Sequence, residues 1–203
     1  MHQSPMSRRE VMAAGTGLLA LPLVLNSRAC GSQPGGKQAD RPAGLTDPRS
    51  LYPKPPFERQ HQDPPGLASK MIPRPDHGER SYKGSGKLSG RKALITGGDS
   101  GIGRAAAIAF AREGADVAFG YLPVEEPDAQ EVVDLIQSEG RKAIPLPGDI
   151  RDESFCKTLV SQAAAGLGGL DILVNNAAQQ VFRESLLEVT TEQMESTFRT
   201  NVF

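Results

Sequence analysis

Residues 93–104, with the sequence ALITGGDSGIGR, decide the fold of this 203-residue chain. The segment Ala93–Thr96 predicts a buried strand, and glycines at Gly97, Gly101 and Gly103 follow in a turn that leads into an Ala-rich helical segment. Because glycine has no Cβ, such a turn lets the backbone approach a pyrophosphate, and the helix start offers unpaired N–H groups. The stretch therefore predicts a nucleotide cradle, although a glycine-rich turn without a ligand gives the same pattern.

Two more segments carry matching signals. The apolar strand Asp171–Val174 ends in Asn175-Asn176-Ala177-Ala178, and Gly148-Asp149-Ile150 follows another predicted strand. With the glycine spacing TGxxxGxG, which differs from GxGxxG, these segments resemble the short-chain dehydrogenase/reductase family in order and position. Three matches in sequence favour nucleotide binding over coincidence.

The resemblance implies a set of cofactor contacts. The turn and the amides of Ser100 and Ile102 would bind phosphates, and Asp149 would hydrogen-bond the adenine amine, although an Asp before a helix is also a common N-cap. Asn175 would tie the central strands together, while Asn176 would line the nicotinamide ribose with Ala177. Thr96 would hold the turn or act as a structural cap. The implied cofactor residues are Gly97, Asp99, Ser100, Gly101, Ile102, Gly103, Tyr121, Asp149, Ile150, Asn176, Ala177 and Ala178.

Cofactor choice in dinucleotide-binding folds depends on an acidic residue about 20 positions after the glycines, which favours NAD. That position falls near Tyr121 and Leu122, and the nearest carboxylates, Glu125 and Glu126, come a turn later. The pattern therefore predicts NADP, with NAD left open. No arginine stands at that position either, although Arg104 is expected near the phosphates.

The resemblance also implies the chemistry. Family members use a Tyr whose pKa is lowered by a Lys four residues on, and a Ser that holds the substrate oxygen. None of Tyr52, Tyr82 and Tyr121 has such a Lys, and only Asn201 matches a fourth catalytic position, the Asn that supports the Lys through water. We expect an NAD(P)-dependent oxidoreductase acting on an alcohol, aldehyde or ketone in a longer parent protein, and an inactive chain if these residues are the whole product.

Two other function classes stay open at this stage. One is a non-catalytic module that senses or sequesters NADP. The other, ranked last because its family has a different glycine spacing, is a non-redox nucleotide-binding domain similar to phosphosugar epimerases.

Strands and helices alternate regularly after residue 90. Strands are predicted at 92–96, 117–121, 142–146 and 171–174, and helices at 102–113, 129–139, 153–167 and from Thr190, where Thr190 and Gln193 form a capping box. This alternation predicts an α/β fold with a doubly wound parallel sheet, similar to the Rossmann fold, covered by helices on both faces. The phosphate site would then lie at the topological switch point.

The first 86 residues predict two further segments. Residues 1–29 contain Arg8-Arg9 before an apolar run that is shorter than the roughly 20 residues of a membrane span, which indicates a twin-arginine signal. We expect a periplasmic or extracytoplasmic location, or a cytoplasmic one if the signal is not used. Residues 30–86 are a Pro- and Gly-rich linker and arm, and residues 87–203 the dinucleotide-binding domain.

The later part of the linker resembles the N-terminal arm of a family subgroup that includes bacterial NADP-dependent aldehyde reductases. Such an arm would pack on the domain or on a neighbouring subunit, whereas a plain linker is the alternative. Ten of the sixteen prolines lie between Pro34 and Pro75, so we expect this stretch to be mobile or extended.

Composition excludes several partners. A formal net charge of −1 provides no positive surface for nucleic acid or anionic lipid, which leaves a small molecule as the expected partner. The two cysteines, Cys30 and Cys156, suggest neither a disulfide framework nor a metal site. The resemblance implies a homo-oligomer for a full-length protein.

Overall fold

The computed structural model describes residues 47–50 and 52–202. The chain divides into the units Met1–Pro48 and Arg49–Phe203, and the fold below belongs to the second. The predicted signal at 1–29, the start of the linker and Cys30 lie outside the described residues. Among the residues described, no helix is both long and apolar enough to cross a membrane.

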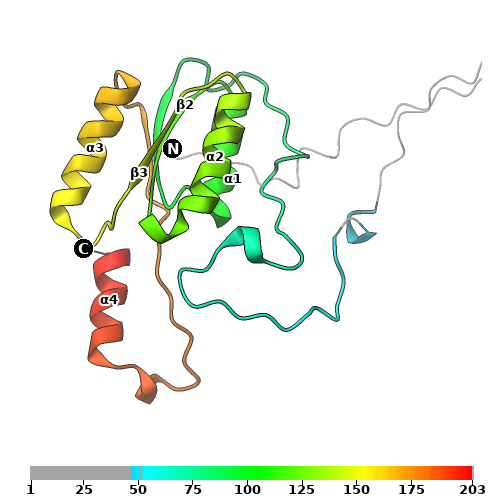
Figure 1. Ribbon diagram of the computed structural model, residues 1–203, viewed down its shortest axis with the longest axis vertical. Coiled ribbons are helices and arrows are strands. Elements are labelled where there is room, and N and C mark those ends of the chain that lie inside the picture. The colour runs from blue at the N-terminus through cyan, green and yellow to red at the C-terminus, as the bar shows by residue number, and fades with distance from the viewer. Residues whose placement is uncertain (1–46, 51, 203) are drawn as a thin grey trace, which may run out of the picture. The chain divides into compact units, whose positions relative to one another are not determined.

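The centre of the domain is a four-stranded parallel sheet with strand order β3-β2-β1-β4 (Figure 1). Its strands are β1 (Lys92–Thr96), β2 (Asp116–Tyr121), β3 (Ala143–Pro147) and β4 (Ile172–Val174). In register, Ala93 of β1 lies opposite Val117 of β2 and Ile172 of β4. The chain builds outward from β1 to β3 and then crosses to the other side of β1, which creates a switch point between β1 and β4.

Helices cover both faces of the sheet. The helices of the described residues are α1 (Gly101–Arg112), α2 (Glu126–Ser138), α3 (Glu153–Leu167) and α4 (Thr191–Asn201), and the first three of them pack on the sheet. The 3-10 turns are η2 (Pro48–Ser50), η3 (Ala68–Lys70), η4 (Pro123–Glu125) and η5 (Leu186–Glu188). Helices α1 and α2 pack on one face around Ile95 and Phe119, while α3 packs on the other against Leu94 and Ala118 (Figure 1). The predicted doubly wound α/β architecture is confirmed.

Local signals explain the helix boundaries. Asp152 accepts a hydrogen bond from the Ser154 amide at the start of α3, and Gly168, with φ of 75°, ends it, so the predicted bounds are confirmed. The capping box of Thr190 and Gln193 is also present at α4. Helix α2 begins three residues before its predicted start, because Pro127 occupies its first turn, where a missing N–H costs nothing.

The arm packs on the domain of its own chain. Its backbone between residues 68 and 87 forms hydrogen bonds with three side chains of the domain: Arg112 of α1, Glu113 directly after α1, and Asp128 of α2. This later part of the arm is therefore ordered on the surface of the domain, because buried and half-buried charged groups of the domain hold its backbone. The surface-packed arm is the alternative that the structure supports.

Candidate nucleotide-binding site

A cleft of about 630 Å³ lies where β1, β2, β3 and β4 end. The predicted cofactor residues line it, with the exception of Gly103. They come from the loops after all four strands, so the parallel sheet brings segments up to 80 residues apart to one edge. Residues that the sequence did not point to also line the cleft: Gln62, Pro64, Pro65, Glu125, Arg151, Gln179, Gln180 and Thr200.

The glycine turn is folded back tightly on the sheet. The amides of Gly97 and Gly98 both donate to the carbonyl oxygen of Gly120, at 2.8 and 3.2 Å. Gly97 and Gly101 have φ angles of 64° and 53°, which favour glycine. A Cβ on Gly103 would lie 1.9 Å from the carbonyl oxygen of Gly97, so Gly103 lies beneath the turn and lets α1 approach it rather than lining the cleft.

The start of α1 is open toward this cleft. Ser100 is the N-cap residue but its side chain caps no amide, in contrast to Asp152 and Thr190 at the starts of α3 and α4. The first intrahelical bond runs from the Arg104 amide to Ser100, so the amides of the first turn have no acceptor within the helix. Ile102 is 81% exposed beside them. This arrangement suits an anionic phosphate group.

Thr96 and Asn176 join the ends of β1 and β4. The Thr96 hydroxyl accepts the amides of Asn176 and Ala177 at 3.0 and 3.1 Å, which gives it the structural role that the sequence left open. The Asn176 side chain donates to the carbonyl oxygens of Thr96 and Gly97. The expectation that Asn175 ties the strands is therefore wrong: Asn175 is exposed, and it is the next residue that turns toward β1.

Two buried carboxyl groups lie at the end of β2. Asp99 is 1% exposed and its Oδ2 has no hydrogen-bond partner, and burial raises the pKa of this carboxyl. Glu125 accepts the Leu122 amide at 3.0 Å, and burial, with the nearby charge of Asp99, raises its pKa to about 7. Glu125, which the sequence places a turn after the position that selects the cofactor, lines the cleft because the turn η4 folds it back.

Tyr121 lines the cleft beside these carboxyl groups. Its hydroxyl donates to Glu126 at 2.6 Å, and burial together with this carboxylate raises the pKa of the phenol. Tyr121 therefore stays protonated at neutral pH, and its ring is buried against Phe119, with ring centroids 5.8 Å apart.

Asp149 and Arg151 form an ion pair at the end of β3. The Arg151 guanidinium contacts both carboxylate oxygens of Asp149, and the Arg151 amide donates to the same side chain at 2.9 Å. These bonds hold the pKa of Asp149 below its usual value. Asp152 is the N-cap of α3, so Asp149 does not cap this helix. Both members of the pair line the cleft and are placed to contact a polar ligand.

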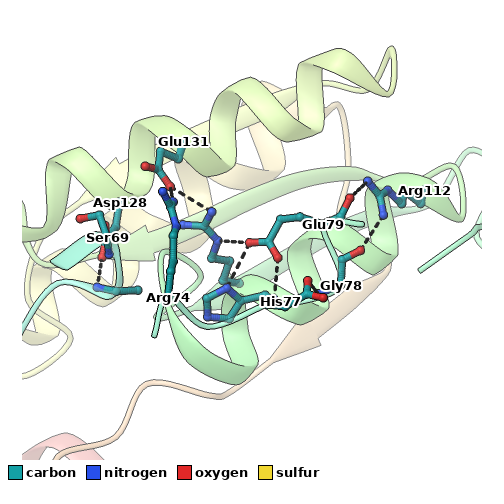
Figure 2. A network of polar contacts seen from close by, with 11 residues as sticks. Ser69, Arg74, His77, Gly78, Glu79, Arg112, Asp128 and Glu131 are labelled. Atoms are coloured by element: carbon teal, nitrogen blue, oxygen red, sulfur yellow. Dashed lines mark hydrogen bonds and ion pairs between the residues drawn. The ribbon is translucent and has the colours of Figure 1, made fainter. Parts of the chain in front are cut away.

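Arg104 points away from the cleft. It is 2% exposed and donates to Glu79 of the arm and Glu131 of α2, each at 3.0 Å. Figure 2 shows these carboxylates in one polar network with Arg74. The expectation that Arg104 lies near the phosphates is wrong, because its position in α1 turns its side chain toward α2 and the arm.

Asn201 belongs to a small cluster near the cleft. Its side chain exchanges two hydrogen bonds with the backbone of Gln179, at 2.9 and 2.8 Å, and Thr200 donates to the Gln179 side chain. Gln179 and Thr200 line the cleft, whereas Asn201 supports them from outside. The catalytic role of Asn201 stays a prediction.

The remaining cysteine has a packing position. Cys156 is half-buried in α3 and its thiol contacts the carbonyl oxygen of Ile150 at 3.1 Å. In the described part of the chain, His, Cys, Asp and Glu side chains form no group of three or more that could hold a metal ion.

These features define a parallel α/β nucleotide-binding fold with its cleft at the switch point. Residues 91–203 match the family described as short chain dehydrogenase, and the chain belongs to that family. The glycine turn and the Asn176-Ala177-Ala178 segment, which carry the resemblance, line one cleft.

Curated relatives are similar along most of this chain. An uncharacterized oxidoreductase of Bacillus subtilis, YhxD, is 59% identical over 161 residues, which cover 79% of this chain and 54% of the relative. The NADPH-dependent aldehyde reductase 1 of Arabidopsis chloroplasts (Arabidopsis thaliana) is 40% identical over 151 residues, covering 72% and 52%. The chain thus spans about half the length of these relatives.

Solved structures show the same architecture. A short chain dehydrogenase of Burkholderia cenocepacia in complex with NADP is 44% identical, with a TM-score of 0.51 over 57% of this chain and 46% of that one. A short-chain type dehydrogenase/reductase of Mycobacterium marinum is 36% identical, with a TM-score of 0.53 over the same shares.

Proposed function

We propose that the chain belongs to a longer NAD(P)-dependent oxidoreductase that transfers hydride between a nicotinamide cofactor and an alcohol or carbonyl substrate. The observation that carries the proposal is the start of α1, which no side chain caps and which faces the cleft of about 630 Å³. The glycine turn beside it leaves no room for a side chain at Gly103. Amides in this position bind a pyrophosphate. The nicotinamide would supply the hydride chemistry, and the protein the binding and orientation.

The residues of the cleft divide between the two halves of the cofactor. The turn and the first amides of α1 would bind the pyrophosphate, and Asp149 with Ile150 the adenine. Asn176, Ala177 and Ala178 line the end of the cleft beside β4, where we place the nicotinamide ribose. Asn201 would support the catalytic machinery from its position behind Gln179.

For the cofactor we propose NADP, with NAD as the alternative. The solved Burkholderia relative is a complex with NADP, and the Arabidopsis relative is named as NADPH-dependent. Glu125 lies where it would face a 2′-phosphate, but its pKa of about 7 means that it is partly protonated at neutral pH. It therefore opposes the phosphate less than an exposed carboxylate would.

The 203-residue chain by itself contains no Tyr with a Lys four residues on. We therefore propose that this chain binds the cofactor without transferring hydride, and that hydride transfer belongs to a protein with the length of its relatives. Export through the twin-arginine route and assembly into a homo-oligomer are further proposals, supported by the sequence at 8–9 and by the family resemblance.

A charge placed beside the open helix start tests the cofactor site. Ile102→Glu puts a carboxylate next to the first-turn amides, and Ile102→Gln is the uncharged control; both should fold, since Ile102 is 81% exposed. Calorimetric titration with NADP and NAD should show binding to the original chain and to the glutamine variant, and at least about tenfold weaker binding to the glutamate variant. Equal binding by all three would refute the phosphate site.

A further inference from the structure

The cleft has a wall that does not come from the Rossmann domain. Gln62, Pro64 and Pro65 of the arm line it together with residues that follow β2 and β3, such as Leu122 and Asp149. Nothing in the glycine motif or the strand pattern points to these three residues. These residues can shape the cleft only if hydrogen bonds hold this part of the arm in a fixed position on the domain.

The turn that carries the wall is closed on itself. The Gln62 side chain donates to the carbonyl oxygen of Leu67 at 3.0 Å and accepts the Leu67 amide at 2.9 Å. Gly66, with φ of 74°, allows the backbone to reverse between them. Pro64 and Pro65 lie inside this loop, so two hydrogen bonds and two rigid rings fix the wall.

The Gln62–Leu67 turn is itself attached to helix α2. Asp128 in the first turn of α2 accepts the amides of Ala68 and Ser69, at 2.6 and 3.2 Å, and is fully buried. Figure 2 shows Asp128 and Ser69 facing each other at one end of the network. A buried carboxylate is costly without hydrogen-bond donors, so Asp128 depends on the amides of the arm. The arm in turn depends on Asp128 for its attachment to α2.

Further contacts hold the rest of the arm. Arg112 donates to the carbonyl oxygens of Gly78 and Glu79, each at 2.7 Å (Figure 2). It also donates to the Tyr82 carbonyl oxygen at 2.6 Å, and Arg104 donates to the Glu79 carboxylate. Glu113 accepts the amides of Ser85 and Lys87. The arm is therefore attached along α1 and α2, and the wall is the part of it that lines the cleft.

Asp128 anchors the arm to α2, and its position decides which half of a dinucleotide the wall would contact. Asp128 lies in α2, directly after Glu125 and the end of β2. Strand β2 lies between β1 and β3, on the side of the sheet opposite β4. The proposed nicotinamide end of the cleft is at β4, so the arm lies at the other end.

We infer that Gln62, Pro64 and Pro65 form a wall of the cofactor site, held by the Gln62–Leu67 turn and Asp128, and contact the adenosine half of the bound dinucleotide. This inference rests on the proposed function. It makes the arm a binding element of the site, so that a change in the arm changes cofactor affinity.

The test compares two pairs of exposed prolines in the complete chain. Pro64→Gly with Pro65→Gly loosens the wall, while Pro53→Gly with Pro55→Gly makes the same change in the arm away from the cleft. Calorimetry with NADP and with ADP, which carries only the adenosine half, should give about fivefold weaker binding of both ligands to the first variant. The control pair should bind like the original chain.

Asp128→Ala extends the test to the anchor. It should weaken NADP and ADP binding at least as much as the change at Pro64 and Pro65, and circular dichroism should show whether the domain is still folded. If the original chain binds NADP and the Pro64 and Pro65 variant binds both ligands equally well, the wall is refuted and the cofactor site stands. If the original chain binds neither NADP nor NAD, both the proposed function and this inference are refuted.

Discussion

The Asn176 side-chain amide donates to the carbonyl oxygen of Gly97 at 2.9 Å, and so fastens the end of β4 to the glycine turn after β1. The same nitrogen lies 3.0 Å from the Thr96 carbonyl oxygen. It would also lie only 2.6 Å from a Cβ on Gly103. The close packing of the glycine turn therefore depends on the Asn176 side-chain amide as well as on the missing Cβ of Gly103.

Asn176→Ala should lower the free energy of unfolding by about 2 kcal/mol, because two hydrogen bonds to half-buried carbonyl groups are lost. Urea unfolding measures this change. Asn175→Ala is the matched control at an exposed position and should change stability by less than about 0.5 kcal/mol. Equal losses in the two variants would contradict the role of Asn176.

Features encoded by neighbouring residues could be predicted from the sequence. The start of α3 at Asp152, its end at Gly168 and the capping box at Thr190 depend on contacts within four residues of the chain. The glycine turn could be located for the same reason, since its backbone angles and its close approach to α1 both require glycine.

Features that depend on distant segments could not be predicted. Arg104 follows the glycine motif directly, yet its partners Glu79 and Glu131 are 25 and 27 residues away, and only the packed arm shows that it turns from the cleft. Strand alternation alone did not tell whether Asn175 or Asn176 faces β1. The entry of Glu125 into the cleft depends on the short turn η4, for which hydrophobic periodicity has no signal.

Arg104→Ala should destabilise the protein by about 3 kcal/mol, because it removes a buried cation and leaves two carboxylates facing each other across the arm contact. Limited proteolysis should then cut the arm faster than the sheet. Arg74→Ala is the control: Arg74 pairs with Glu131 too but is about half-exposed, so its loss should cost less than about 1 kcal/mol. Equal effects of the two variants would show that Arg104 does not anchor the arm.

Glu125 should make the stability of the fold depend on pH. Its pKa rises from 4.5 to about 7 on folding, chiefly through burial and then through Asp99. The folded state thus binds more protons between these values, and the free energy of unfolding should fall as pH rises from 4.5 through 7. Glu125→Gln can still accept the Leu122 amide, so it should melt above the original chain at pH 8 and close to it at about pH 4. A constant difference across this range would contradict the assignment.

The predicted export signal can be tested by a conservative change. Replacing Arg8 and Arg9 by Lys keeps the positive charge and should abolish twin-arginine export, because that route depends on the arginine pair. Cell fractionation should then find the variant in the cytoplasm, whereas the original sequence should be recovered outside it. Replacing Arg28 by Lys is a control within the same segment and should leave the distribution unchanged. Export that survives the loss of both arginines would exclude this route.

The Glu125 carboxyl group should also make the preference between NADP and NAD depend on pH. Above pH 7 Glu125 is ionised beside Asp99 and Asp128, and its charge should oppose the 2′-phosphate of NADP but not the ribose hydroxyl of NAD. The ratio of the NADP to the NAD dissociation constant should therefore rise by about fivefold between pH 6 and 8. The 2′-phosphate titrates in this range as well, so Glu125→Gln is needed to separate the two effects. A ratio that follows the same curve in the glutamine variant would show that Glu125 does not face the phosphate.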